Sequence, residues 1–358
     1  MALKTEKFVY ELINERYTHL CVVPCSFAKY LINEAINNTN IEYIPCASEA
    51  VACSIAAGLK ISGKSPIVIV QSSGLTNMGS CITSLLKPYN ITFPIITSWR
   101  TYNEGDSEIQ HKHLASELPS LIEAYGYKHE ILDNINLTIC MDQLNNAKET
   151  FIMCILKKDS FSPVKLNKMH KIDLSNYPKR SEYLEFLNKK FENSKVVFIG
   201  TTGNTAREMF TYMPSTNNFY MAGNMGGALS LGLGIGLEGK DVFVCGGDAE
   251  FVMHMGGLTT AGRYKNKVNL TYILFDNESN KSTGGQNSYQ AHLDYLSIAC
   301  SSGFNIYQKT ITNLDDFISA IDFKEKNKCL KFIHVKCSYD SEAPRPPLEV
   351  IRQNNLHE

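Results

Sequence analysis

Oxygen-bearing side chains follow two apolar, β-branched segments in the second half of the sequence. Asp248 follows segment 242–246 after one glycine, and Asn277 follows the next such segment about 30 residues on, one βαβ unit further. If both segments are strands of one parallel sheet, their carboxyl ends meet where such sheets bind ligands. There, a carboxylate and an amide oxygen can converge on one hard cation, completed by backbone carbonyls and phosphate oxygens. The small neighbours Gly247 and Ala249 would let backbone N–H groups approach a phosphate.

Each of these two elements alone has a simpler explanation. Asp248 could cap a helix, and Asn277 could form a turn with its neighbour Asp276. Because the two occur together at this spacing, the sequence favours a metal–phosphate site over two unrelated structural roles.

A glycine-rich segment at residues 223–227 follows the apolar stretch 218–222 and opens an Ala- and Gly-rich helical segment. Such a turn before a helix suggests a dinucleotide-binding fingerprint. However, its spacing is not G-x-G-x-x-G, and no acidic residue ends the following strand, where a ribose would need one. The sequence therefore argues against a dinucleotide site. Met225, within this segment, is equally compatible with a core position.

These features resemble the signature of the thiamine-diphosphate enzymes, which is G-D-G or G-D-A followed one βαβ unit later by N-N or D-N. Here the signature reads Gly247-Asp248-Ala249 and Asp276-Asn277. The resemblance covers nearly the whole of both halves and is closest to the 2-oxo-acid decarboxylases of the phosphonopyruvate decarboxylase type. The segments that extend it are 23–26, 71–75, 99–100, 110–111, 201–203, 207–208, 253–256 and 282–286.

The resemblance implies a set of cofactor and metal contacts. The side chains of Asp248 and Asn277 and the backbone carbonyl of Ser279 would hold Mg²⁺ against the diphosphate. The carbonyl of Gly223 would accept a hydrogen bond from the 4′-amino group of thiamine diphosphate, and Met225 would support its two rings in a bent conformation. The further cofactor contacts implied are Ser73, Gly74, Thr202, Gly247 and Ala249.

Glu49 is the expected activating carboxylate. Thiamine chemistry needs a buried acid hydrogen-bonded to N1′ of the aminopyrimidine, because this bond favours the imino tautomer that removes the C2 proton. Glu49 follows the apolar segment 41–45 and begins an apolar, Ala-rich segment with helical character. Taken alone, a glutamate at this position is explained as well by compensation of a helix dipole. The family pattern N-E-G reads Ser48-Glu49-Ala50 here, so the local turn is expected to differ.

The resemblance also implies substrate contacts at Ser26, Arg100 and His111. Arg100 could pair bidentately with a substrate anion, and His111 would take part in catalytic proton transfer. Thr101 stands where the family has glycine and is expected to narrow the approach to Arg100. Glu250 stands where the family often has Ser or Ala, and its carboxylate would repel a diphosphate unless it points away.

The elements that must position these residues alternate in type along the chain, which predicts an α/β protein with two doubly wound parallel sheets. A polar, proline-punctuated stretch separates the two series of elements. We expect a pyrimidine-binding domain at 1–157, a linker at 158–182 and a diphosphate-binding domain at 183–358, without a middle domain. The predicted strands are 20–23, 41–45, 66–71, 94–99, 151–156, 196–201, 242–246, 270–275 and 332–335, and the predicted helices include 49–61, 181–191, 226–237, 252–262 and 314–321.

Composition and charge limit the range of partners. The 358 residues carry a formal net charge of −1, which gives no long-range attraction to nucleic acid or to an anionic membrane. Charged residues near the start and the absence of a long apolar run predict no signal peptide and no membrane span, so a cytoplasmic location is the default. The eleven cysteines include no C-x-x-C pair, which favours buried, reduced thiols over a zinc or redox motif.

The resemblance thus implies a thiamine-diphosphate- and Mg²⁺-dependent decarboxylase that converts 3-phosphonopyruvate to phosphonoacetaldehyde and CO₂. The alternatives are a sulfopyruvate decarboxylase, another 3-substituted-pyruvate decarboxylase or carboligase, and a catalytically silent cofactor-binding oligomer. Glu49 argues against the silent binder, which would not need it. The resemblance further implies a homodimer or higher homo-oligomer with active sites between subunits, acting on a small-molecule 2-oxo acid.

Overall fold

The computed structural model describes residues 2–102, 108–215, 217–323, 329–339 and 343–351. The chain forms two compact units. Unit 1 comprises Met1–Lys171 and Asn280–Asn287, and unit 2 comprises Ile172–Ser279 and Ser288–Glu358. The main division therefore lies inside the predicted linker 158–182. The short segment Asn280–Asn287, expected within the second domain, groups with unit 1.

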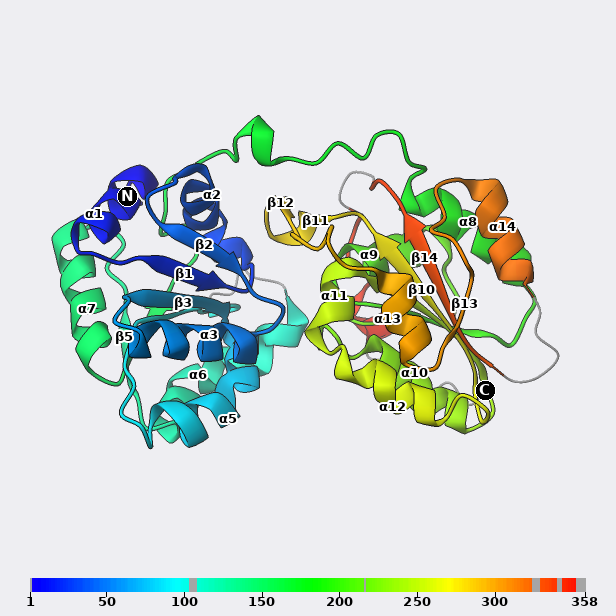
Figure 1. The fold of residues 1–358 in the computed structure, drawn as a ribbon, viewed down its shortest axis with the longest axis horizontal. Helices are drawn as coiled ribbons and strands as arrows, with labels where there is room; N and C mark the ends of the chain where they lie inside the picture. Colours follow the sequence, from blue (N-terminus) through cyan, green and yellow to red (C-terminus); the bar gives the residue numbers. More distant parts are fainter. Residues whose placement is uncertain (1, 103–107, 216, 324–328, 340–342, 352–358) are drawn as a thin grey trace. The chain divides into compact units, whose positions relative to one another are not determined.

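Unit 1 contains a six-stranded sheet in the order β2-β1-β3-β4-β6-β5, in which every pairing is parallel. Helices cover both faces of this sheet (Figure 1). Its strands are β1 (His19–Val22), β2 (Glu42–Pro45), β3 (Pro66–Gln71), β4 (Ile95–Ser98), β5 (Lys128–Ile131) and β6 (Ile152–Leu156). Its helices are α1 (Thr5–Asn14), α2 (Lys29–Asn37), α3 (Glu49–Ile61), α4 (Ser72–Leu75), α5 (Gly79–Cys81), α6 (Lys112–Ala124) and α7 (Leu137–Glu149).

The central strand β3 and the helix α3 show how the sequence builds unit 1. The first five residues of β3 are buried, as a strand covered on both faces requires. Helix α3 begins after Ser48, whose side chain accepts a hydrogen bond from the backbone N–H of Val51 at 3.4 Å. It ends before Gly63, whose φ of +79° suits glycine. Ser48 therefore caps the helix that carries Glu49, although the family pattern has Asn there.

Residues 158–171 pack along unit 1 instead of forming a free linker. Phe161 is buried and its ring lies 4.9 Å from that of Phe8. The hydroxyl of Thr5 donates to the carbonyl of Ser162 at 2.6 Å, and the Asn33 amide donates to the carbonyl of Val164 at 2.9 Å. The start of the chain and helix α2 are therefore both fastened to this segment.

Unit 2 contains a second six-stranded parallel sheet, in the order β13-β14-β10-β9-β7-β8. Two hydrophobic cores pack around this sheet, one with residues of α10, α12 and α13 and the other with residues of α8, α9 and α14. The strands are β7 (Val197–Gly200), β8 (Phe219–Tyr220), β9 (Asp241–Gly247), β10 (Asn269–Asp276), β13 (Asn305–Ile306) and β14 (Leu330–Lys336). The helices are α8 (Arg180–Phe191), α9 (Asn204–Tyr212), α10 (Ala228–Leu237), α11 (Asp248–Met253), α12 (Gly256–Arg263), α13 (Tyr295–Ser301), α14 (Leu314–Asp322) and α15 (Leu348–Ile351). The short strands β11 (Ser279–Asn280) and β12 (Gln286–Asn287) pair with each other.

The predicted α/β class with two parallel sheets is confirmed. One predicted element differs in detail: the expected helix 252–262 is two helices, α11 and α12, because the backbone leaves the helical conformation at His254 (φ −123°, ψ 44°). All eleven cysteines are free, and most are buried. Within the described part of the chain, every helix is too short or too polar to cross a bilayer.

Candidate active site

Glu49, the first residue of α3, lies in a closely packed part of unit 1. It is buried, and its Oε2 accepts a hydrogen bond from Nδ2 of Asn77 at 2.8 Å. The backbone of Gly74 approaches from the end of β3 so closely that a Cβ there would lie 2.1 Å from Oε1 of Glu49. Only glycine can therefore stand at position 74 while Glu49 keeps this place. The sequence pointed to Glu49 and Gly74 separately, and the structure brings them together.

Ser73 completes the turn after β3. Its hydroxyl accepts a hydrogen bond from Nε2 of Gln71 at 2.8 Å, and its carbonyl accepts one from the hydroxyl of Thr76 at 2.7 Å. These bonds hold the short helix α4 against the end of the strand. Ala50, where the family has glycine, lies within α3 and needs no special backbone conformation.

The three expected substrate residues lie in one cluster, in which Arg100 and His111 are buried and Ser26 is half-buried. We call it the Arg100 cluster, and it consists of Ser26, Phe27, Gln71, Arg100, Glu108 and His111. Within it, Nη1 of Arg100 donates to the Ser26 hydroxyl at 2.7 Å and to Oε1 of Gln71 at 3.4 Å. The guanidinium also lies over the ring of Phe27, 4.5 Å from its centroid. The structure thus joins Ser26 to Arg100 directly.

Glu108 links Arg100 to His111. Nη2 of Arg100 donates to Oε2 of Glu108, and the same oxygen lies 3.2 Å from Nε2 of His111. All three residues are buried. Nδ1 of His111 is buried without a hydrogen-bond partner among the described residues. Sequence reasoning missed Glu108, and the available signal was its position three residues before His111, on the same turn.

The backbone at Thr101 has a conformation that favours glycine, which is the residue that the family has at this position. Its φ is +59°, in the left-handed region that a β-branched residue rarely adopts. Its hydroxyl donates to the carbonyl of Glu108 at 3.3 Å, a bond that glycine could not make. The chain thus keeps the backbone conformation of a glycine and uses the added hydroxyl to hold Glu108.

In unit 2, Asp248 follows β9 at the start of α11. It is buried, and its Oδ2 has no hydrogen-bond partner among the described residues. Burial, and then the negative charge of Asp276, raise the pKa of Asp248 to about 7. A Cβ added to the preceding Gly247 would meet no atom within 4 Å, so the space beside this backbone is open. Ala249, the next residue, is half-buried.

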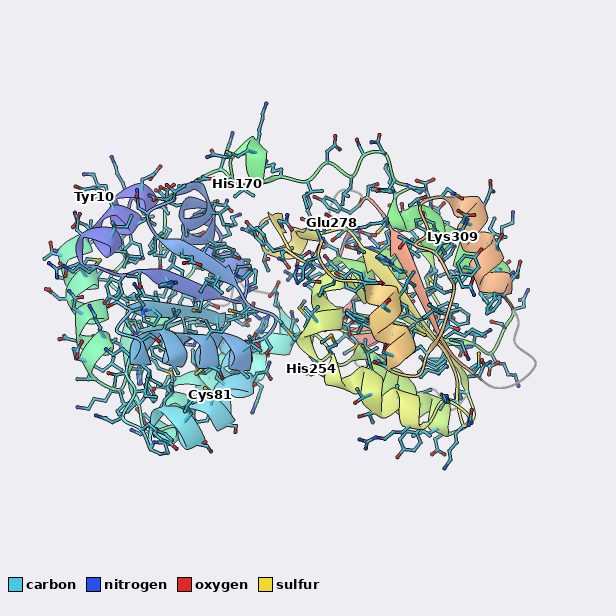
Figure 2. All side chains as sticks on the ribbon, in the orientation of Figure 1. Tyr10, Cys81, His170, His254, Glu278 and Lys309 are labelled. Atoms are coloured by element: carbon cyan, nitrogen blue, oxygen red, sulfur yellow. The ribbon has the colours of Figure 1, made fainter. Side chains whose placement is uncertain are left out.

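Asn277 lies in the turn after β10, the strand next to β9. Its Oδ1 accepts a hydrogen bond from the backbone N–H of Ser279 at 3.1 Å, and Oδ1 of Asp276 accepts one from that of Glu278 at 3.1 Å. Glu278, labelled in Figure 2, has a φ of +50°. The side chains of Asp276 and Asn277 thus stabilise a turn, as the alternative explanation of this pair predicted. The same turn places Asn277 and Ser279 at the carboxyl edge of the sheet.

A charged network holds Asp276 at this edge. Its Oδ2 lies 2.8 Å from Nζ of Lys336 and 3.0 Å from Nε2 of His334, and Lys336 also pairs with Glu278. Burial alone would raise the pKa of Asp276, but the hydrogen bonds and charges of His334 and Lys336 outweigh it and lower the pKa below its usual value. Asp276 therefore remains a carboxylate and adds negative charge near Asp248.

The carboxylate of Glu250, expected to repel a diphosphate unless it points away, pairs with a residue of the core. Glu250 is buried, and its carboxylate accepts a hydrogen bond from the hydroxyl of Tyr272. Burial raises the pKa of Glu250 to about 7. Gly246 makes room for this pair, because a Cβ there would lie 2.2 Å from the Tyr272 oxygen. The carboxylate is thus directed at Tyr272 in the core.

The remaining predicted cofactor residues lie at the ends of β7 and β8. The hydroxyl of Thr202 donates to the carbonyl of Ala222 at 2.8 Å, which ties the end of β7 to the segment that contains Gly223. Met225 in that segment is half-buried. The next residue, Gly226, has a φ of +92°, and a Cβ there would lie 2.8 Å from the His254 ring. The turn therefore requires glycine for conformation and for space.

Comparison with known proteins agrees with this geometry. The model of the thiamine pyrophosphate enzyme N-terminal TPP binding domain matches residues 4–118, and that of the C-terminal TPP binding domain matches residues 199–335. Phosphonopyruvate decarboxylase from Streptomyces viridochromogenes is 28% identical over 331 residues, which are 85% of this chain and 81% of that protein. Sulfopyruvate decarboxylase from Methanosarcina acetivorans is 25% identical over 372 residues, 96% of this chain and 94% of that protein.

A third relative covers a smaller part of the chain at higher identity. The beta subunit of sulfopyruvate decarboxylase from Methanocaldococcus jannaschii is 36% identical over 173 residues, which are 47% of this chain and 88% of that subunit. The two domain models together match most of the chain, one in the unit that contains Glu49 and the other in the unit that contains Asp248. This chain belongs to the thiamine pyrophosphate enzymes.

Proposed function

We propose that this protein uses thiamine diphosphate and Mg²⁺ to decarboxylate 3-phosphonopyruvate, giving phosphonoacetaldehyde and CO₂. The observation that carries the proposal is the buried Glu49, which is fixed by Asn77 and closely approached by Gly74. A protein that only binds the cofactor has no need of an acid in this position. The likeness to the phosphonopyruvate decarboxylase of Streptomyces viridochromogenes supports the choice of substrate.

The residues of unit 2 fit the metal and the diphosphate. Asp248 offers a buried carboxylate oxygen that has no hydrogen-bond partner in the part of the chain that the structure describes, and the backbone beside Gly247 is open. No group of three or more His, Cys, Asp or Glu side chains that could hold a metal occurs among the described residues. A cation here therefore needs amide, backbone and phosphate oxygens besides Asp248, which is the ligand set that Mg²⁺ prefers. Asn277 and Ser279 would supply the first two.

The residues of unit 1 fit the reacting part of the cofactor and the substrate. Bound thiamine diphosphate supplies a nucleophilic carbon that adds to the keto group and an electron sink for the departing carboxylate. Glu49 would hydrogen-bond to the aminopyrimidine and hold a proton there. Arg100 and the Ser26 hydroxyl would bind the terminal anion of the substrate, and His111 would move a proton at the reacting carbon.

Sulfopyruvate decarboxylation is the second candidate function. It is favoured by the likeness to the enzyme of Methanosarcina acetivorans, which extends over 96% of this chain. The two substrates share the 2-oxo-acid part and differ in the terminal anion, so the Arg100 cluster is where the choice between them is made.

We further propose a homo-oligomer with thiamine diphosphate held between subunits. In support, one relative is named as the beta subunit of a sulfopyruvate decarboxylase and covers less than half of this chain. Light scattering after size-exclusion chromatography measures the mass in solution, and a monomeric, fully active species would contradict this part of the proposal.

The deciding experiment compares three acids with the full chain loaded with thiamine diphosphate and Mg²⁺. Phosphonopyruvate, sulfopyruvate and pyruvate are supplied in turn, and the aldehyde formed is trapped as a hydrazone and quantified. We expect kcat/KM to be highest for phosphonopyruvate and lowest for pyruvate, which would leave the donors of the Arg100 cluster unpaired. A higher value for sulfopyruvate would establish the second candidate, and a higher value for pyruvate would contradict both.

A further inference from the structure

The residue expected to bind the substrate anion already holds an internal anion. Arg100 is 6% exposed and pairs with Glu108, which is 9% exposed. A guanidinium buried to this extent is costly without a partner. In the absence of substrate, Glu108 supplies that partner, and a substrate anion that approaches Arg100 meets a carboxylate already in place.

A single oxygen of Glu108 serves two residues. Oε2 contacts both Nη2 of Arg100 and Nε2 of His111, the latter at 3.2 Å. If this carboxylate moves away, the guanidinium and the imidazole both lose their contact with it, whereas the contacts of Arg100 with Ser26 and of His111 with Gln71 remain. Anion binding at Arg100 and the availability of His111 for proton transfer are therefore coupled through one group.

We propose that Glu108 is a specificity-determining residue that takes the place of the substrate's terminal anion in the empty site and is displaced when that anion binds. The inference rests on the proposed function for its substrate class. A phosphonate or sulfonate can replace the carboxylate on Arg100, and its arrival then frees His111. Pyruvate has no terminal anion, so it leaves Glu108 on both residues.

Thr101 tethers the backbone of Glu108, which limits how far its side chain can move. The Thr101 hydroxyl donates to the backbone carbonyl of Glu108 at 3.3 Å, and the backbone of Thr101 lies in the left-handed region at φ +59°. Glycine at position 101 would adopt the same backbone conformation without strain and would lack the tether. Thr101 thus opposes the displacement that the proposal requires, which gives a second way to test it.

The test uses methylphosphonate as a probe of the terminal group, titrated calorimetrically into the full chain with thiamine diphosphate and Mg²⁺. Glu108→Gln keeps the shape of the side chain and removes its charge. We expect methylphosphonate to bind about tenfold or more tighter than to the wild type, the scale of one charge-assisted hydrogen bond. KM for phosphonopyruvate should fall in parallel, while KM for pyruvate stays unchanged. If Glu108 merely held Arg100 in position, the variant would bind methylphosphonate more weakly, and weaker or unchanged binding overturns the proposal.

Three further variants make the result specific. Glu117→Gln changes an exposed glutamate of α6 in the same way and should leave methylphosphonate affinity as in the wild type. Arg100→Met in the Glu108→Gln background should abolish binding, and retained binding would place the anion elsewhere and overturn the proposal. Thr101→Gly should also tighten methylphosphonate binding, but by less than Glu108→Gln does. If the Glu108→Gln variant does not fold, the affinity of the Thr101→Gly variant tests the proposal instead. Methylphosphonate affinity is measured independently of turnover, so a wild type inactive toward all three acids would refute the proposed function without deciding the role of Glu108.

Discussion

The contact between Gly74 and Glu49 can be tested by a single methyl group. In Gly74→Ala the new Cβ would lie 2.1 Å from Oε1 and 2.5 Å from Cδ of Glu49, whereas Cβ atoms essentially never approach closer than 3.0 Å. Glu49 must therefore retreat by about 1 Å, which is enough to reduce turnover by about 100-fold if Glu49 acts on the cofactor. The overpacking should also lower the free energy of unfolding by about 1–3 kcal/mol, and the melting temperature by roughly 2–4 °C per kcal/mol in units of this size.

The assay combines kcat/KM for phosphonopyruvate with thermal unfolding followed by circular dichroism. Gly58→Ala is the matched control, because it lies on the same helix as Glu49 and its added Cβ meets no atom within 4 Å. That variant should keep full activity and gain up to about 1 kcal/mol of stability from the better helix former. A folded Gly74→Ala variant with activity within twofold of the wild type would show that the position of Glu49 does not govern catalysis.

Four further predictions follow from the two units. Glu49→Gln should keep cofactor binding but strongly slow deuterium exchange at the cofactor C2, which NMR can follow; unchanged exchange would move the activating role to another residue. Asp248→Ala should abolish the thermal stabilisation produced by thiamine diphosphate with Mg²⁺, and unaltered stabilisation would remove Asp248 from the metal site. Gly246→Ala should lower the melting temperature of the cofactor-free protein, because its Cβ meets Tyr272. Gly247→Ala should keep that melting temperature and weaken cofactor binding. Equal effects of the two substitutions would contradict the placement of Gly247 beside the diphosphate. A hydrogen bond from Cys53 lowers the pKa of Cys81 to about 7, so alkylation of Cys81 (Figure 2), followed by mass spectrometry, should rise between pH 6 and 8 and then level off, and Cys53→Ala should shift this rise to higher pH.

Much of the fold could be predicted because the central strands of its sheets are buried on both faces. Strand β3 (Pro66–Gln71) and helix α3 (Glu49–Ile61) have the bounds that the sequence predicted, since one is a continuous apolar run and the other an uninterrupted helical segment. Strand β5 (Lys128–Ile131) was not predicted. It lies at the edge of its sheet with exposed ends and half-buried polar residues, so it lacks the apolar run that marks the central strands.

The site could be predicted only where a motif or a strand end marks it. Asp248 and Asn277 follow adjacent parallel strands, and this order is visible in the sequence. Arg100 and Glu108 pair although they lie outside every predicted strand and helix, so no motif or periodicity in the sequence marks their contact. The contact between Glu250 and Tyr272 likewise depends on the space left by Gly246, and spatial fit of this kind appears only in three dimensions.

The segment that follows β6 matters for anyone who wishes to study the halves separately. A fragment that stops at residue 157 would lose Phe161 from beside Phe8 and would leave the Thr5 hydroxyl and the Asn33 amide without their acceptors. A protease cleavage site or a gene break is therefore better placed after Lys171, at the main division of the two units, and the fragment then lacks only Asn280–Asn287 of unit 1. Residues 158–171 of the predicted linker are thus part of the first unit, and a fragment of that unit has to include them.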